Sequence, residues 1–131
     1  MIDVACAIIV NLSGQVLVTQ RSAAMKLPLK WEFPGGKVES DETPEDCLTR
    51  EIREELSIAI NIISELPSNQ HCYPDFSINL IPFICEIKYG TIKLHEHLKY
   101  LWLPANDLLD LDWAEADLPI VKNYLTSLNA T

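Results

Sequence analysis

The stretch GGKVESDETPEDCLTREIREELSI, residues 35–58, constrains the fold of this chain more than any other segment. It contains the start of a helix, because Thr43 suits the N-cap, Pro44 suits the first helical position, and the acids that follow suit the positive end of the helix dipole. We expect this helix to end near Leu56. The two glycines ahead of it are expected to break regular structure and to let the backbone approach a neighbouring group closely.

Carboxylates crowd one face of the expected helix. At 100° per residue, Glu51, Glu54 and Glu55 lie within about 100° of one another, beside the apolar stripe that faces the core. Each like-charged pair destabilises the helix by about 0.2–0.5 kcal/mol, and each acid in the last turns adds about 0.3–1 kcal/mol. A solvated acidic face leaves this placement unexplained. A divalent cation such as Mg²⁺ or Mn²⁺ explains it, because such ions prefer several hard oxygen ligands and would cancel the repulsion.

Further groups flank these carboxylates. Arg50 lies one turn before Glu54, and the spacing fits both an ordinary i, i+4 ion pair and a role in holding Glu54 in one rotamer. Gly35 and Gly36 carry no side chain, so their carbonyl groups could contact a metal ion, or their amides a phosphate. The segment therefore combines the parts of a site for metal and phosphate.

The rest of the pattern favours an α+β fold. Besides the acidic helix, strands are expected over residues 2–10, 15–19, 58–66, 69–73, 76–87 and 100–103, helices over 104–109 and 115–128, and loops over 22–30 and 89–97. This order favours a mixed sheet with helices on both sides over a doubly wound parallel sheet. Pro82 suggests that its strand lies at an edge or carries a bulge. The length of 131 residues suits one domain, residues 1–131.

Charge and composition argue against several classes of partner. The net charge is −9 and no basic face is visible, which is unlike a protein that binds a nucleic-acid backbone. No apolar run is long enough to cross a membrane, and the N-terminus does not resemble a signal peptide, so we expect a cytoplasmic protein without a membrane partner. The four cysteines form no CxxC pair, and neither zinc nor a redox pair is expected. An acidic chain can still bind a phosphorylated substrate if a divalent metal bridges the two.

The acidic segment resembles the Nudix box, the signature of the Nudix hydrolases, in Gly36, Glu42 and the run REIREELSI at residues 50–58. The resemblance continues outside the box, residues 36–58, in WEFPGGK at 31–37 and AEADLP at 114–119, which are similar to the MutT and CTP pyrophosphohydrolase branch. One position departs, because the family usually has a left-handed glycine where this chain has Ser57. The resemblance implies an α/β/α sandwich around a mixed sheet.

The resemblance also implies an activity and a metal site. Nudix hydrolases cleave a nucleoside diphosphate linked to another group, and MutT-like members convert a nucleoside triphosphate into the monophosphate and pyrophosphate, with Mg²⁺ or Mn²⁺ as cofactor. The implied metal ligands are the Gly35 carbonyl and the carboxylates of Glu51, Glu54, Glu55 and Glu96. The same glutamates and Arg50 are the implied catalytic residues. Glu96 could also be an ordinary exposed loop residue, and the HxH motif of His95 and His97 around it lacks a third zinc ligand nearby in the sequence.

Substrate recognition is expected from several strands and loops. Arg21 aligns with a family arginine that contacts phosphates, although a solvated charge explains it equally well, and Lys37 is grouped with it. A pocket for the base, or simply core, is expected at the apolar residues Val4, Phe33, Phe76 and Ile78. Asp117 stands where MutT has an asparagine, and Phe76 where MutT has an arginine. An ionised Asp117 accepts hydrogen bonds only, so it favours bases that present an amino group, as in CTP, dCTP or modified pyrimidine nucleotides.

Three further interpretations compete with a Mg²⁺-dependent enzyme of nucleotide-pool sanitation. An 8-oxo-dGTP diphosphatase keeps the same chemistry. A substrate in which a sugar or second nucleoside replaces the last phosphate keeps the fold, but the short chain disfavours it. From another class, some MutT-like domains are modules that recognise damaged bases in DNA and lack the catalytic glutamates, whereas this chain retains them and is acidic. The expected partner is a small nucleoside triphosphate, and the protein is expected to be a monomer or a homodimer.

Overall fold

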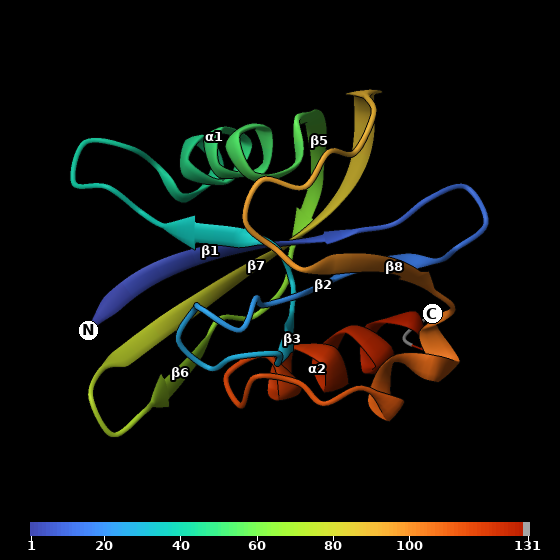
Figure 1. Ribbon diagram of the computed structural model, residues 1–131. Coiled ribbons are helices and arrows are strands. Elements are labelled where there is room, and N and C mark those ends of the chain that lie inside the picture. Colours follow the sequence, from blue (N-terminus) through green and yellow to red (C-terminus); the bar gives the residue numbers. More distant parts are fainter. Residues whose placement is uncertain (130–131) are drawn as a thin grey trace.

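A computed structural model describes residues 1–129 of the chain. Figure 1 shows a layer of strands with helix α1 on one side and helix α2 on the other. None of the helices in this described range is long and apolar enough to cross a membrane. The elements follow the chain in the order β1 (Ile2–Ile9), β2 (Val16–Gln20), β3 (Trp31–Glu32), β4 (Gly35–Lys37), α1 (Pro44–Leu56), β5 (Ile58–Glu65), β6 (Asn69–Cys72), β7 (Ser77–Gly90), β8 (Lys99–Leu103), the 3₁₀-helix η1 (Ala105–Asp110) and α2 (Leu118–Leu128).

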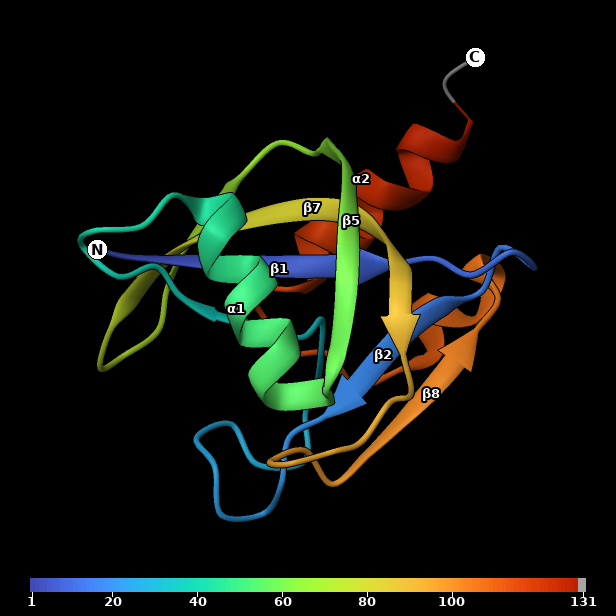
Figure 2. The ribbon, with the colours of Figure 1, turned by 90° about the horizontal axis from the view of Figure 1, so that it is seen from above.

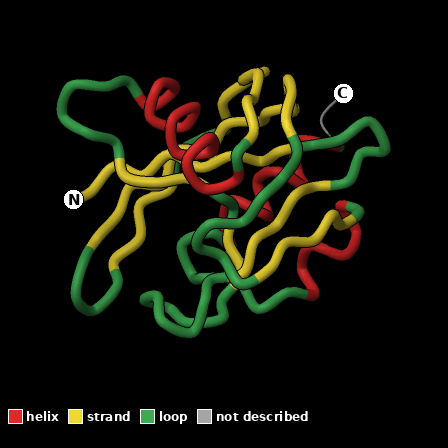
Figure 3. Tube along the Cα trace, turned by 45° about the horizontal axis from the view of Figure 1, so that its top comes forward, coloured by secondary structure: helices red, strands yellow, loops and turns green. Residues whose placement is uncertain are grey.

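Two sheets make up the strand layer. The larger sheet has the order β4-β1-β7-β5, with β6 also paired to β7, and the smaller sheet has the order β3-β2-β8. Strands β1 and β7 run parallel, whereas the other pairs of the larger sheet are antiparallel, so this sheet is mixed. Helix α1 crosses the larger sheet beside β1 and β5, and α2 lies behind that sheet (Figure 2). Figure 3 shows the loops that connect these helices and strands. The expected α+β architecture, with helices on both sides of a mixed sheet, is confirmed.

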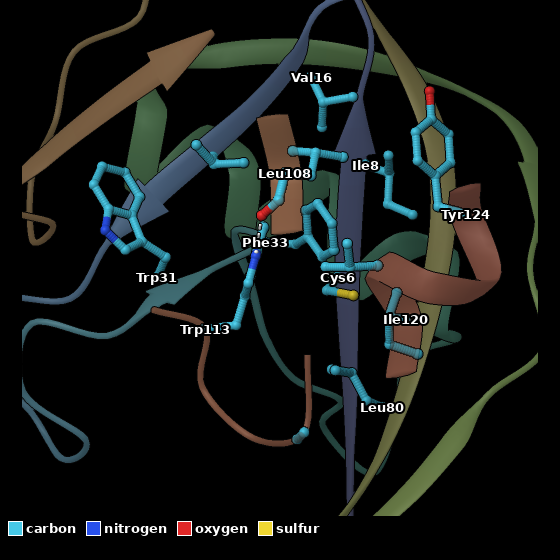
Figure 4. Close-up of a cluster of buried hydrophobic side chains, with 13 residues drawn as sticks. Cys6, Ile8, Val16, Trp31, Phe33, Leu80, Leu108, Trp113, Ile120 and Tyr124 are labelled. Carbon is cyan, nitrogen blue, oxygen red and sulfur yellow. Dashed lines mark hydrogen bonds between the residues drawn. The ribbon is translucent and has the colours of Figure 1, made fainter. Parts of the chain in front are cut away.

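Strand β1 builds the core on both sides because both of its faces are buried. Alternate residues from Ala5 to Ile9 pack under α1. The intervening Cys6 and Ile8 point to the other side, where they join Ile120 and Tyr124 of α2 in the cluster shown in Figure 4. A strand that is apolar on both faces is typical of the interior of a sheet covered by helices on both sides.

Helix α1 begins and ends where its sequence predicts. The Thr43 hydroxyl accepts a hydrogen bond from the amide of Asp46 at 3.1 Å, and Pro44 opens the helix. At the other end Ser57 adopts the left-handed conformation, with φ 59° and ψ 30°, and its amide donates to the Arg53 carbonyl. The backbone thus has the shape that a capping glycine normally provides.

The expected break at the two glycines is wrong in one respect. Residues Gly35–Lys37 form β4, which pairs antiparallel to β1. Their close approach to a neighbour is confirmed, because a Cβ atom on Gly35 would collide with the backbone carbonyl of Ala5. The glycine therefore lets β4 lie against β1 and carries the chain into the site.

Of the two alternatives expected for the strand of Pro82, an edge position or a bulge, the edge position is wrong. Strand β7 is central, with β1 on one side and β5, then β6, on the other. The proline is tolerated because it lies where β5 gives way to β6: the amide of Leu66, just beyond β5, donates to the Pro82 carbonyl, and β6 pairs with β7 from Leu80 onward. A register shift between Ile62 and Ser64 of β5 lies close to this change of partner.

Two boundaries differ by three residues from those expected. Strand β7 continues to Gly90, which shortens the loop before β8 to residues 91–98. Helix α2 begins at Leu118 and not at residue 115. The preceding turn is held out of the helix because the amide of Ala114 donates to the Trp31 carbonyl and the amide of Ala116 donates to the Tyr73 hydroxyl.

Replacement of Gly35 by alanine should destabilise the protein by about 1–3 kcal/mol, since overpacking against a backbone atom forces β4 away from β1. Urea denaturation would measure this loss. Gly14→Ala is the control: within the described residues its Cβ atom meets nothing within 4 Å, so it bears only the left-handed strain of φ +78°, about 1 kcal/mol. A Gly35→Ala protein as stable as the wild type would contradict the close packing of β4.

Candidate active site

Arg50 organises the carboxylates of α1. Its guanidinium donates to both oxygens of Glu42, at 2.7 and 3.2 Å, and also to Glu51 at 2.9 Å and Glu54 at 3.2 Å. The i, i+4 contact with Glu54 is therefore present, but the two-pronged contact with Glu42 is the more extensive one. The hydrogen bonds from Arg50 lower the pKa of Glu42 to about 2. One cation thus offsets part of the repulsion among these acids.

Glu51 lies directly against the backbone of β4. A Cβ atom on Gly36 would collide with the Glu51 carboxylate, so the missing side chain makes room for this acid. Burial raises the pKa of Glu51, while its hydrogen bond with Arg50 acts in the opposite direction. The two glycines therefore serve different contacts. Gly35 lets the backbone of β1 pack closely, and Gly36 leaves space for the Glu51 carboxylate.

Glu55 is the most buried acid of this face, with only 9% of its surface exposed. Its Oε2 atom has no hydrogen-bond partner among the described residues. Burial, together with the negative charges of Glu32, Glu51 and Glu96, raises the pKa of Glu55 to about 9, although the backbone of Gly35 acts in the opposite direction. A buried carboxyl oxygen without a partner is costly for the fold, and it is a ready ligand for a cation.

The donor set fits a hard divalent cation. Carboxylate oxygens on one helix face, together with the backbone of Gly35 beside Glu55, are the ligand types that Mg²⁺ and Mn²⁺ prefer. No three carboxylate, imidazole or thiol groups within residues 1–129 already converge as a metal cage. Glu51 and Glu54 each direct an oxygen at Arg50. Glu96 is exposed in the loop 91–98, close enough for its charge to raise the pKa of Glu51 and Glu55.

A cavity of about 330 Å³ opens beside this face. Its lining joins Gly35, Gly36 and Glu55 to strands β1 and β7 and to the segment before α2. All six residues expected to bind substrate contribute to the lining, namely Arg21, Phe33, Lys37, Phe76, Ile78 and Asp117, and so does Val4. Residues that are distant in sequence thus line one cavity, whose wall contains both acidic and apolar side chains, with Glu55 as the lining acid from α1.

Several residues of the cavity wall have no counterpart in the sequence analysis. The ring of Tyr73 packs on that of Phe76 with 4.9 Å between centroids, and the Lys26 ammonium lies 5.0 Å from the centroid of the Phe76 ring. Glu32 accepts hydrogen bonds from Arg21 at 2.9 Å on one oxygen and contacts the His97 ring at 2.8 Å on the other. Glu32 stands within the WEFPGGK motif, which was the available signal for it.

Asp117 is buried and hydrogen-bonded to the backbone. One of its oxygens accepts a hydrogen bond from the amide of Phe33 at 3.0 Å. Burial raises the pKa of Asp117 well above its usual value, and the charge of Glu32 raises it further. The neutral acid, which donates as well as accepts, is therefore favoured over the carboxylate.

Replacement of Glu55 by glutamine should stabilise the metal-free protein. The folded chain keeps a proton on Glu55 that the unfolded chain loses above pH 4.5, so stability falls as pH rises from about 4.5 to about 9. Glutamine removes this slope, and we expect a gain on the order of a few kcal/mol at pH 8 in urea denaturation with EDTA. Glu65→Gln, on an exposed acid of β5, is the control. Equal pH dependence of Glu55→Gln and wild type would contradict the burial of this acid.

Comparison with known proteins identifies the family. The model of the NUDIX domain matches residues 1–124. The chain is 35% identical to the CTP pyrophosphohydrolase of Escherichia coli over 95% of this chain and 92% of that protein, and 48% identical to the 8-oxo-dGTP diphosphatase of Haemophilus influenzae over the same shares. The solution structure of the Escherichia coli ORF135 protein superposes with a TM-score of 0.86 at 34% identity, covering 99% of this chain and 92% of that one. The chain belongs to the Nudix family, whose members hydrolyse nucleoside diphosphates linked to a further group and generally use a divalent metal.

Proposed function

We propose that this protein is a Mg²⁺-dependent pyrophosphohydrolase that converts a nucleoside triphosphate into the monophosphate and pyrophosphate. The observation that supports this most directly is the continuity of the 330 Å³ cavity, whose wall includes Glu55 beside the acidic face of α1 and Asp117 with apolar groups. A nucleotide bound there places its phosphates near the acids and its base among the apolar side chains. CTP, dCTP or a modified-base relative is the favoured substrate.

Different residues have different roles in the proposed reaction. Glu51, Glu54, Glu55 and Glu96, with the Gly35 carbonyl, would hold Mg²⁺, which supplies charge neutralisation for the phosphate oxygens. Arg50 keeps Glu51 and Glu54 together through its hydrogen bonds. One carboxylate of the set accepts the proton of the attacking water. Arg21 and Lys37 bring positive charge to the cavity wall for the phosphates.

The base is the part of the substrate that the cavity selects. Phe33, Phe76 and Ile78 offer apolar contact to a base of any kind. A neutral Asp117 can donate from its hydroxyl to N3 of cytosine and accept from the N4 amino group, while the same carbonyl oxygen still accepts from Phe33. The raised pKa of Asp117 therefore supports a cytosine-type substrate, for a different reason than an ionised carboxylate would.

Hydrolysis of 8-oxo-dGTP is the second candidate. The relative from Haemophilus influenzae that carries this name is 48% identical to the chain, which is more than the CTP pyrophosphohydrolase of Escherichia coli. In its ionised form Asp117 could accept hydrogen bonds from the N1–H and N2 amino groups of a guanine base. The choice between the two bases thus depends on the protonation of a single buried side chain. A module that only recognises damaged bases is disfavoured, since the carboxylates of α1 and their Arg50 partner are all retained.

A nucleotide panel tests the activity itself. Purified protein with Mg²⁺ should release pyrophosphate, and no orthophosphate, from CTP, 5-methyl-dCTP and 8-oxo-dGTP, with the cytosine nucleotides preferred in kcat/KM. EDTA should abolish the release. Formation of orthophosphate, or a strong preference for 8-oxo-dGTP at pH 7, would contradict the proposed products or the proposed base.

Replacement of Glu54 by glutamine tests the role of the acidic face. The change should lower kcat by about 100-fold or more, because a ligand of the metal and its charge are lost. Thermal stability should stay near that of the wild type, since Glu54 is exposed and its contact with Arg50 is an exposed ion pair. Thr49→Ala, on the same helix, is the control. Activity within twofold of the wild type would remove Glu54 from the proposed site.

The protonation of Asp117 should make base preference depend on pH. As pH rises through the raised pKa of Asp117, the neutral acid gives way to the carboxylate, so the ratio of kcat/KM for CTP over 8-oxo-dGTP should fall. Asp117→Asn keeps one donor and one acceptor at every pH, and the ratio for that variant should be flat. Equal pH profiles of the ratio for wild type and variant would contradict base recognition by Asp117.

A further inference from the structure

The loop 91–98, which carries Glu96, is attached to the end of α1. Strand β7 reaches Gly90 beside Ser57, so closely that a Cβ atom on Gly90 would lie 3.0 Å from the Ser57 carbonyl. The amide of Lys93 then donates to the Leu56 carbonyl at 2.9 Å, and the amide of His95 donates to the Glu55 carbonyl at 3.2 Å. These are terminal carbonyls of α1 that have no partner within the helix. The loop therefore caps α1, and Figures 1 and 2 show it passing beside that helix end.

A side-chain contact adds to this attachment. The Ser57 hydroxyl and Nε2 of His95 are 2.7 Å apart, although the two residues are 38 positions apart in the sequence. Ser57 holds a left-handed conformation that suits glycine better. A glycine at this position would relieve the strain, but it could not contact His95. Ser57 therefore bears some backbone strain and gains a hydrogen bond to the loop.

The second histidine of the HxH motif fixes the other end of the loop. His97 is buried, and its Nε2 lies 2.8 Å from Oε2 of Glu32, whose other oxygen accepts from Arg21. The next amide, that of Leu98, donates to the Gln20 carbonyl of β2. Glu96 accordingly lies between one histidine directed at α1 and another directed at β3.

We propose that Ser57 and His95 are positioning residues that hold Glu96 against the carboxylate face of α1, with His97 and Glu32 as the second anchor of the loop. The two imidazoles point to different partners, so the HxH motif works as a pair of hydrogen-bonding anchors. Neither histidine touches the substrate in this proposal. The positioning role rests on the proposed function in one respect, because the proposed function makes Glu96 a metal ligand or the base of the reaction.

The replacement Ser57→Gly separates positioning from stability. It removes the hydroxyl and relieves the left-handed strain, so the melting temperature should stay the same or rise. The kcat should nevertheless fall by roughly threefold to tenfold, the range expected for one lost hydrogen bond, with KM for the nucleotide nearly unchanged. His95→Ala should behave alike, the double variant should be no worse than either single one, and His95→Gln, which keeps a nitrogen in reach, should recover most of the loss.

Two measurements without turnover keep the test independent of the proposed function. In metal-free protein, hydrogen exchange of the amides of residues 93–98 should be faster in Ser57→Gly and His95→Ala than in wild type. The Mn²⁺ affinity of nucleotide-free protein, measured by electron paramagnetic resonance, should fall by roughly threefold to tenfold in both. Thr49→Ala, which loses a hydroxyl bonded only within α1, should change neither.

The outcomes distinguish the positioning role of Ser57 and His95 from the proposed function. Unchanged exchange and unchanged Mn²⁺ affinity in Ser57→Gly and His95→Ala would overturn the positioning role. Faster exchange with wild-type kcat and wild-type Mn²⁺ affinity would also overturn it, because the loop would then be attached without placing Glu96. Absence of turnover in the wild type with every nucleotide would contradict the proposed function alone. The hydrogen-exchange and Mn²⁺-affinity data would still decide the role of Ser57 and His95.

Discussion

The crowding of carboxylates at the end of α1 is the constraint on which the rest of the site depends. Arg50 compensates two of these acids, Glu51 and Glu54, and also binds Glu42 ahead of the helix, but Glu55 remains buried without a cationic partner among the described residues. The surrounding structure is shaped to accept this arrangement: Gly36 leaves space for Glu51, and loop amides satisfy the carbonyl groups at the helix end. Stability is given up locally in a site whose acids suit a cation, a compromise that functional sites commonly show.

The rest of the fold brings two chemically different walls to one cavity. Strand β1 is buried on both faces, so α1 and its acids occupy one side of the larger sheet while α2 and the segment before it occupy the other. Phe33, which bonds to Asp117, is followed three residues later by Gly36, which leaves room for Glu51. Only Pro34 and Gly35 therefore separate the residue that contacts Asp117 from the residue that contacts the acids of α1.

Local signals in the sequence were sufficient for α1, because Thr43, Pro44 and the capping position Ser57 each act on their immediate neighbours. They were insufficient where a distant segment decides the outcome. Gly35–Lys37 forms a strand only because β1 lies beside it, and Pro82 is accepted in a central strand only because β5 ends there. The raised pKa of Asp117 follows from burial, and the bond of Ser57 to His95 from a loop 38 residues away. Neither is visible in spacing or composition.

Asp117 and the acidic face of α1 are both held in place by hydrogen bonds, so the fold sets the distance between them. Asp117 is held by the hydrogen bond to Phe33 and the acidic face by the network around Arg50. Under the proposed function, a nucleotide bound by its base would have to span this separation with its own sugar and phosphates. The number of phosphates, and not only the identity of the base, would then decide which bond lies beside the carboxylates, and a nucleotide with too few phosphates would bind without being cleaved.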